Sequence, residues 1–265
     1  MSATLSPDAI ALIKGFEGCS LRPAWPGFSS GVTLGSGVDI GADPEALAAW
    51  KPYVSADDFA RLEKVKGVTG AAAGPLAAAL SDIAIGAADA LAVLAGFTLP
   101  RFVAATLKAF PGAGDLPDDS FGALVSLVFN RGGSTTGKNR GEMAVIKTDV
   151  AAGEGQWTDI IVQLAKMVVY WNDGVPTASN LPGRRLAEAA LFARGLRGIG
   201  QLPGALIKGD DGSRVVALQK ALKIGADGDF GPGTMIAVFD HQKDAASLAA
   251  TGVADAATLA ALGVA

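Results

Sequence analysis

Glu17 is the residue whose surroundings first indicate acid–base chemistry. It follows Ile10 by seven positions and Ile13 by four, so on a helix its carboxyl group lies on the same face as these apolar side chains. A carboxyl group partly removed from water keeps its proton more firmly and can serve as a general acid near neutral pH. The alternative is a solvated glutamate at a frayed helix end. Glu17 is therefore a candidate proton donor.

The cysteine and histidine content narrows the remaining chemistry. The 265 residues include one of each, Cys19 and His241. A single cysteine cannot close an intrachain disulfide, and the two residues are too few for a zinc site. They are also far apart in the sequence, so a Cys–His hydrolase would have to span two domains. We expect carboxylates and hydroxyls to perform any chemistry, without a metal or other cofactor.

Composition indicates a folded protein. Hydrophobic residues make up 50% of the chain and the mean hydropathy is +0.36, which excludes intrinsic disorder. The net charge of −4 and the pI of about 5.0 argue against a nucleic-acid partner. The most apolar long segment, residues 71–97, is rich in alanine and contains Pro75, Asp82 and Asp89, so we expect buried helices and no membrane insertion. We expect a monomer.

The elements that would position Glu17 begin with a helix. Ser6 is a candidate N-cap, Pro7 suits the first helical position, and Asp8 falls in the first turn. Gly18 is expected to end this helix after Glu17. Residues 23–41 are rich in Gly, Ser and Pro with short apolar runs, which predicts a small β-hairpin.

The rest of the chain is expected to be helical. From residue 44 to about 195, apolar residues recur at spacings of three and four. The period is lost at 196–208, which we interpret as a linker, and a compact unit follows at 209–265. Two phrases in that unit, DGDFGPGT (227–234) and GVADAAT (252–258), each place an acidic turn before a threonine that opens a helix. The sequence thus predicts a mainly α protein with a small β-hairpin (domain 1–195), followed by a pseudo-symmetric three-helix domain.

Four segments, in order, resemble phage-type lysozymes, the muramidases of glycoside hydrolase family 24. In that family the acidic Glu ends the first helix and a Thr lies on the following hairpin, positions that correspond here to Glu17 and Thr33. The resemblance implies a lysozyme-like α+β domain that cleaves peptidoglycan. The four segments are FEG (16–18), VTLGSG (32–37), ALVSLVFNRG (123–132) and LPGRRLAE (181–188).

The sequence departs from the usual family pattern at the second carboxylate. The family's Asp nine positions after the Glu is replaced by Pro26, and Val38 replaces the His of the hairpin. Around Thr33 and Asp39 the chain is similar to a divergent branch of lysozyme-like proteins in which the acidic partner follows the Thr. Asp39 is also the only acid within 18–41, which makes it the candidate base. The alternative is an Asp that caps the turn before a glycine.

The resemblance implies general acid and base catalysis at the MurNAc–GlcNAc β-1,4 bond. Glu17 would protonate the glycosidic oxygen, while Asp39 and Thr33 would hold and activate water on the opposite face. The resemblance favours inversion, although the sequence does not fix the separation of the carboxyl groups. A lytic transglycosylase that uses Glu17 alone is one alternative. A wall-binding phage protein without activity is another, favoured by the loss of the acid at Pro26.

Candidate substrate-binding residues lie later in the chain. Positive charge is concentrated in two stretches, near 131–140 and 184–197, and could steer the carboxylates of peptidoglycan. Three of the candidates have a structural alternative: a helix C-cap for Asn130, core packing for Trp171, and pairing with local acids such as Glu188 for Arg184. The candidates are Asn130, Arg131, Arg140, Trp171 and Arg184.

The tail resembles peptidoglycan-binding modules of the three-helix type. The resemblance rests on V-x-x-L-Q at 215–219, DGDFGPGT at 227–234 and AVFDHQ at 237–242, the last with one inserted residue. Asp229, Phe230 and Thr234 are the candidate wall-binding residues, although the motif can serve the fold alone. With no basic segment before the first apolar residues, we expect no secretory signal. As a phage endolysin the protein would stay in the host cytoplasm until a holin released it to the wall.

Overall fold

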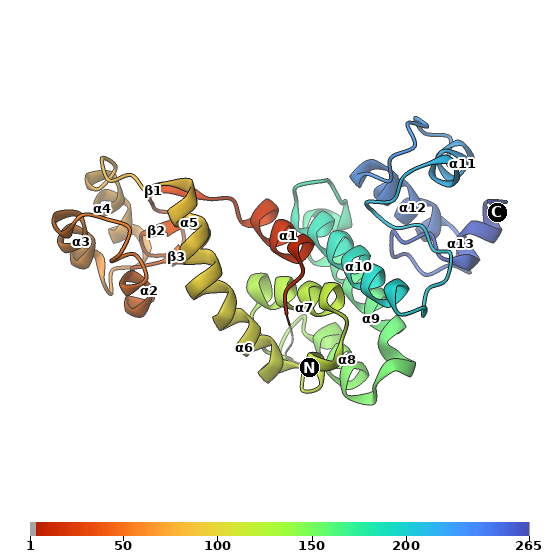
Figure 1. The fold of residues 1–265 in the computed structure, drawn as a ribbon, viewed down its shortest axis with the longest axis horizontal. Coiled ribbons are helices and arrows are strands. Elements are labelled where there is room, and N and C mark those ends of the chain that lie inside the picture. Colours follow the sequence, from red (N-terminus) through yellow and green to blue (C-terminus); the bar gives the residue numbers. More distant parts are fainter. Residues whose placement is uncertain (1–3, 265) are drawn as a thin grey trace. The chain divides into compact units, whose positions relative to one another are not determined.

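The computed structural model describes residues 4–264 and is mainly helical with one small antiparallel sheet, so the predicted fold class is confirmed (Figure 1). The chain forms two compact units. The hairpin unit is Glu17–Val103, and the helical unit is Met1–Phe16 together with Ala104–Ala265. The catalytic candidates all fall in the hairpin unit, and the candidate binding residues all fall in the helical unit.

The first helix, α1, has the bounds that its sequence predicts, Pro7–Glu17. The Ser6 hydroxyl accepts a hydrogen bond from the Ala9 N–H at 3.1 Å, which caps the helix start. Gly18 follows with a φ of 66°, a left-handed conformation that glycine adopts without steric cost. Local sequence alone therefore positions Glu17 as the last helical residue.

The sheet of the hairpin unit has three strands in the order β1 (Ser20–Ala24), β2 (Thr33–Gly35) and β3 (Val38–Asp39). The predicted hairpin is β2 and β3, and β1 adds an antiparallel strand that the sequence did not indicate. Leu34 and Val38 are buried against Trp50 and the rest of the unit's core. The helices of this unit are α2 (Pro44–Ala48), α3 (Ala56–Leu62), α4 (Ala73–Ala79) and α5 (Ala87–Val93).

One helical run in the described part of the chain, Ala87–Ala109, is long and apolar enough to cross a membrane by length and composition. It consists of α5, a π-helical turn at Leu94–Thr98, and α6 (Leu99–Ala109). Core helices of soluble proteins pass the same test, so a single run of this kind is weak support for a membrane span. The absence of membrane insertion stays a prediction.

The helical unit is organised around α10 (Leu181–Gly198), which packs against α7 (Asp118–Arg131) and α9 (Trp157–Lys166). Helix α8 (Gly141–Ala152) packs on α9. Small residues allow the helices to approach closely: a Cβ at Gly122 would lie 2.2 Å from the Ala9 Cβ. Most residues of α10 are buried, which makes it the central helix of this unit.

The segment interpreted as a linker is largely part of the tail. Helix α10 continues to Gly198, and residues 205–207 are buried. Leu206 and Ala254 exchange two backbone hydrogen bonds of 2.9 and 3.0 Å, and the Phe230 N–H donates to the Asp210 carbonyl at 2.8 Å. The end of this segment is thus attached by backbone hydrogen bonds to two loops of the tail.

The tail contains α11 (Ser213–Ala221), α12 (Pro232–Asp244) and α13 (Ala256–Ala261), which confirms the three expected helices. A buried glutamine holds each of its two loops. The Gln219 amide accepts from Gly228 N–H at 2.9 Å and donates to the Asp229 carbonyl at 2.9 Å and to the Thr234 hydroxyl at 3.0 Å. Thr234 is the third residue of α12, whose N-cap is Gly231, so this hydrogen bond joins Gln219 to the first turn of that helix.

Gln242 repeats the arrangement one helix later. It accepts from the N–H groups of Thr251 and Gly252, both at 2.9 Å, and donates to the Val253 carbonyl at 2.7 Å and the Thr258 hydroxyl at 2.9 Å. The two arrangements, here called the glutamine clamps, explain why the two acidic turn phrases echo each other. The expected internal pseudo-symmetry is confirmed in its hydrogen bonds.

Replacing either clamp glutamine by leucine should destabilise the tail. A buried polar group that loses its partner costs about 1–3 kcal/mol, and each clamp satisfies several. We expect Gln242→Leu and Gln219→Leu each to lower the free energy of unfolding by about 3 kcal/mol, measured by urea denaturation. Lys243→Met, an exposed change on the same helix as Gln242, is the matched control. Leucine variants that unfold at the wild-type urea concentration would show that the clamps do not hold the loops.

A buried carboxyl group on α8, Asp149, lies close to the half-buried Asp159 of α9 and makes stability depend on pH. Asp149 is 8% exposed, and burial raises its pKa, as do the charge and hydrogen bond of Asp159. Because the folded state holds this proton more tightly than the unfolded state, the contribution to stability is complete at acid pH and falls as pH rises through the raised pKa.

Asp149→Asn should therefore stabilise the protein at pH 7 and have little effect near pH 3. Removing the penalty of a buried charge gives a gain of about 1 kcal/mol, or about 2–4 °C in Tm for a chain of this size. Thermal melts at pH 3, 5 and 7 measure the difference, with the exposed Asp57→Asn as control. Equal melting temperatures for Asp149→Asn and the native chain at pH 7 would contradict the assignment.

Candidate functional site

Thr33 and Asp39 are brought together by the hairpin. They are directly opposite each other on β2 and β3, so their side chains share one face of the sheet. Thr33 is 9% exposed, and Asp39 and Glu17 are half-buried. Glu17 connects to the same sheet through Gly18 and Cys19, because β1 begins at Ser20. All the catalytic candidates thus belong to one short stretch of compact structure.

The Asp39 carboxylate holds two backbone segments together. Its Oδ2 accepts a hydrogen bond from Gly31 N–H at 2.8 Å, and its Oδ1 accepts from Gly41 and Ala42 N–H at 3.1 and 2.8 Å. A Cβ at Gly31 would lie 2.5 Å from Oδ1 and 2.7 Å from the Gly41 Cα, so only glycine permits this approach. The turn-capping role considered for Asp39 is confirmed, and its role as a base stays a prediction.

The loop before β2 presents an aromatic residue that sequence reasoning passed over. Phe28 is 94% exposed and has a φ of 53°, a conformation that is uncommon for a bulky residue. The loop is closed by two hydrogen bonds, Trp25 Nε1 to the Ser30 carbonyl at 3.1 Å and Ser30 N–H to the Gly27 carbonyl at 3.2 Å. The sequence signal that could have identified Phe28 is an aromatic residue within a segment rich in Gly, Ser and Pro.

In the helical unit, cationic and aromatic side chains gather where α7 ends. The Arg131 guanidinium lies 5.1 Å from the ring centroids of both Tyr170 and Trp171, and Arg185 lies 5.8 Å from Trp171. The two rings meet edge to face at 6.0 Å. Such cation–π contacts stabilise arginines beside aromatic faces. Trp171 is half-buried and in contact with two cations, so it is not a simple core residue.

Arg131 and Arg140 retain donors without acceptors. Arg140 Nη2 donates to the Arg131 carbonyl at 2.6 Å, and Arg131 Nη2 donates to the Asn139 carbonyl. In the described part of the chain, the buried Nε and Nη1 of Arg131 and Nη1 of Arg140 have no hydrogen-bond partner. Burial lowers the pKa of Arg131, and the charge of Arg140 lowers it further. Two adjacent, partly desolvated guanidinium groups with spare donors favour an anionic ligand.

Arg184 and Arg185 surround a fully buried carboxylate on their own helix. Glu188 Oε1 accepts from Arg184 Nε at 3.1 Å, from Arg185 Nη2 at 2.9 Å and from the Ser126 hydroxyl at 2.7 Å. All three charged side chains are at most 1% exposed. The pairing with Glu188 that the sequence offered as an alternative is confirmed. The binding role of Arg184 stays a prediction.

Asn130 lies next to this cluster. Its Oδ1 accepts from Arg185 Nη2 at 3.2 Å, and the side chain is half-buried. The helix continues past it to Arg131 and is capped by Gly132, which has a φ of 70°. The alternative interpretation of Asn130 as the helix C-cap is therefore wrong.

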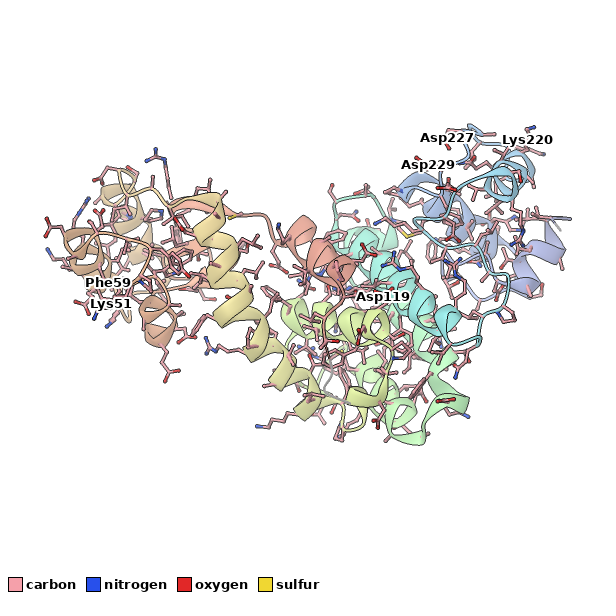
Figure 2. The ribbon with its side chains drawn as sticks, in the orientation of Figure 1. Lys51, Phe59, Asp119, Lys220, Asp227 and Asp229 are labelled. Carbon is pink, nitrogen blue, oxygen red and sulfur yellow. The ribbon has the colours of Figure 1, made fainter. Side chains whose placement is uncertain are left out.

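The tail candidates differ in exposure. Phe230 and Thr234 are 1% and 4% exposed, and Thr234 is held by the first glutamine clamp. Asp229 is exposed, on the loop between α11 and α12 that also carries Asp227 (Figure 2). Of these candidates, only Asp229 offers its side chain to a ligand from outside the tail.

The tail matches the model of a known protein family. Residues 211–262 match the family model of a peptidoglycan binding domain. No curated protein shows significant sequence similarity to the chain. The family match indicates a modular protein that associates with peptidoglycan. The described residues contain no group of three or more His, Cys, Asp or Glu side chains arranged to hold a metal ion.

Removing Glu188 should destabilise the helical unit severely. Breaking a buried ion pair by deleting one partner costs about 3–5 kcal/mol, because the remaining charge stays buried. We expect Glu188→Ala to lower the free energy of unfolding by this amount in urea denaturation. Ser126→Ala removes one hydrogen bond and should cost about 1 kcal/mol. The exposed Glu154→Ala is the control, and a loss for Glu188→Ala no larger than for Glu154→Ala would contradict the structural role.

Proposed function

We propose that the protein is a peptidoglycan hydrolase of the lysozyme type that cleaves the MurNAc–GlcNAc β-1,4 bond and so lyses bacterial walls. The observation that carries the proposal is the family match of residues 211–262, which attaches the chain to peptidoglycan. The lysozyme-like segments around Glu17 and Thr33 then supply a reaction for the polymer that the tail binds. A phage endolysin combines these two activities in one chain.

The proposed proton donor is Glu17, and its target is the glycosidic oxygen. Glu17 ends α1 and is half-buried beside the start of the sheet, and a general acid must lie within hydrogen-bond reach of the oxygen that it protonates. Protonation makes the departing sugar hydroxyl a good leaving group as positive charge develops on the ring.

Asp39 and Thr33 are the proposed partners of the attacking water. An ionised carboxylate has about four lone-pair sites. Backbone N–H groups use two on Oδ1 of Asp39 and one on Oδ2, so Oδ2 keeps a site for a water O–H. Thr33, opposite on β2, supplies a hydroxyl on the same face of the sheet. The hydrogen bonds from the backbone also fix the direction of that remaining site.

The spare donors of Arg131 and Arg140 support an anionic substrate. Peptidoglycan carries carboxylates on its lactyl-peptide groups, and a guanidinium group binds a carboxylate through two parallel hydrogen bonds. Trp171, which lies within 5.1 Å of the Arg131 guanidinium and 5.8 Å of that of Arg185, places an aromatic ring beside these donors. Arg131, Arg140 and Trp171 are therefore the proposed binding residues in the helical unit.

Hydrolysis of purified peptidoglycan tests the acid assignment. Loss of a general acid lowers rates by about 10²–10⁴-fold, so we expect this loss for Glu17→Gln. Glu45→Gln, the same change at an exposed position in the first turn of α2, should leave the rate unchanged. A Glu17→Gln protein that hydrolyses peptidoglycan at the wild-type rate would remove Glu17 from the mechanism.

Asp39→Asn tests the base. Its amide keeps an acceptor for Gly41 and Ala42 but offers no acceptor to Gly31, so a thermal melt must first show that the fold persists. We expect a folded protein with hydrolysis reduced at least tenfold. Full hydrolysis by Asp39→Asn, with reducing-end products in mass spectrometry, would leave Asp39 as a purely structural residue.

Two other functions remain as specific alternatives. A lytic transglycosylase needs only Glu17 and forms anhydro-MurNAc ends, and the engagement of Asp39 by three backbone groups favours it. Mass spectrometry of the wild-type digest distinguishes anhydro-MurNAc ends from reducing ends.

The second alternative is a wall-binding protein without activity, which is favoured by Pro26 at the position of the family's acid. A zymogram with no clearing by the wild-type chain would support this second alternative.

A further inference from the structure

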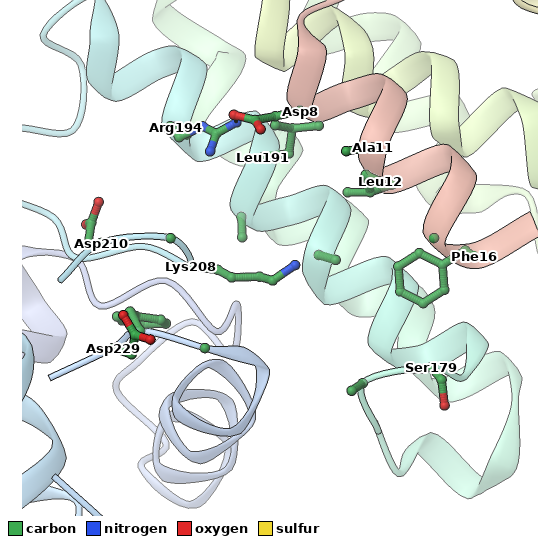
Figure 3. Close-up of a pocket in the computed structure, with 17 residues that line it drawn as sticks. Asp8, Ala11, Leu12, Phe16, Ser179, Leu191, Arg194, Lys208, Asp210 and Asp229 are labelled. Carbon is green, nitrogen blue, oxygen red and sulfur yellow. Dashed lines mark hydrogen bonds and ion pairs between the residues drawn. The ribbon is translucent and has the colours of Figure 1, made fainter. Parts of the chain in front are cut away.

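A pocket of about 540 Å³ lies within the helical unit, between α1, α10 and two segments of the tail (Figure 3). Its size is within the range of small-molecule sites. Helix α1 contributes Leu12 and Phe16, α10 contributes Leu191 and Arg194, and the tail contributes Lys208 and Phe230. None of the candidate residues for catalysis takes part in it.

Lys208 extends into this pocket toward α10 (Figure 3). It is half-buried, and no hydrogen bond or ion pair among the described residues involves its ammonium group. Burial lowers the pKa of Lys208, and the charge of Arg194 lowers it further while Asp8 opposes this. A cation that is desolvated without a partner is stabilised by any anion that enters.

The other charged groups around the pocket are neutralised or exposed. Arg194 pairs with Asp8 and, at 2.7 Å, with Asp119. Asp210 pairs with Arg197 at 2.8 Å. Asp229 is exposed, where solvent and salt screen its charge. Lys208 is thus the cation that the pocket offers to a ligand.

The pocket walls are small and apolar around this charge. Alanines and glycines of α1 and α10 alternate with larger side chains, so the surface can accept methyl groups and short aliphatic chains. A ligand that fits combines a free carboxylate with a small apolar body. The small wall residues are Ala11, Gly15, Ala187 and Ala190.

We propose that this pocket binds the peptide stem of peptidoglycan, with a stem carboxylate on Lys208 and alanine methyl groups against α1 and α10. The inference rests on the proposed function only through its substrate, peptidoglycan, and not through the cleavage step. The tail residues 229–231, which line the pocket, belong to the segment that matches a peptidoglycan binding domain, so part of the pocket wall comes from that domain. The chain would then bind the peptide stems of peptidoglycan as well as its glycan strands.

Calorimetric titration of the full chain with a sugar-free stem tetrapeptide tests the proposal. A hydrogen bond to a charged group contributes about 1.5–3 kcal/mol, equivalent to about tenfold or more in Kd. We expect Lys208→Met to weaken binding by at least tenfold, and the wild-type chain to lose as much affinity for the tetrapeptide with amidated carboxyls. Lys220→Met, at an exposed lysine of α11, should bind as wild type.

A second variant fills the pocket without touching its charge. Ala11 is exposed on α1 at the pocket wall, so Ala11→Trp should keep the fold, checked by circular dichroism, and should also weaken tetrapeptide binding. Wild-type affinity in both variants, equal affinity for the amidated peptide, or no binding by the wild-type chain would overturn the proposal. Peptide binding without wall hydrolysis would contradict the hydrolase and retain the pocket, and hydrolysis without peptide binding would do the reverse.

Discussion

The buried carboxylate of Glu188 is the interaction on which the helical unit depends. Burying an ion costs several kcal/mol unless partners replace its hydration, and here two guanidinium groups and a hydroxyl do so. The hydroxyl belongs to α7 and the arginines to α10, so the ionic cluster fixes the register of the two central helices. Arg185 also contacts Asn130 and Trp171, which links the packing of the core to the residues proposed to bind anions.

Much of this arrangement could be predicted from short-range sequence patterns. Helix α1 follows from Ser6, Pro7 and Gly18, because capping depends on neighbouring residues alone. Pairing of Glu188 with Arg184 and Arg185 follows from helical spacings of four and three. The tail repeat was visible as two similar phrases because each clamp lies within a single stretch of chain.

What escaped prediction depends on contacts between segments. The engagement of Asp39 requires Gly31 and Gly41 to touch, and no local pattern reveals that approach. Lys208 was assigned to a linker because its surroundings lack periodicity, whereas the structure places it in a pocket whose other walls come from α1 and α10. Strand β1 was missed for the same reason, since its partner β2 lies beyond a long loop.

The glutamine clamps have a consequence for how the tail can change. Each clamp fixes the path of its loop from inside, through a side chain that solvent never reaches. In the first loop, the Asp227 carboxylate joins the clamp by accepting hydrogen bonds from the Gln219 amide at 2.7 Å and from the Asp229 N–H at 3.0 Å, whereas the Asp229 side chain is exposed. A tail built in this way keeps the side chains that maintain its fold separate from exposed loop side chains such as that of Asp229, so substitutions at the exposed positions can change what the loop binds without altering the fold.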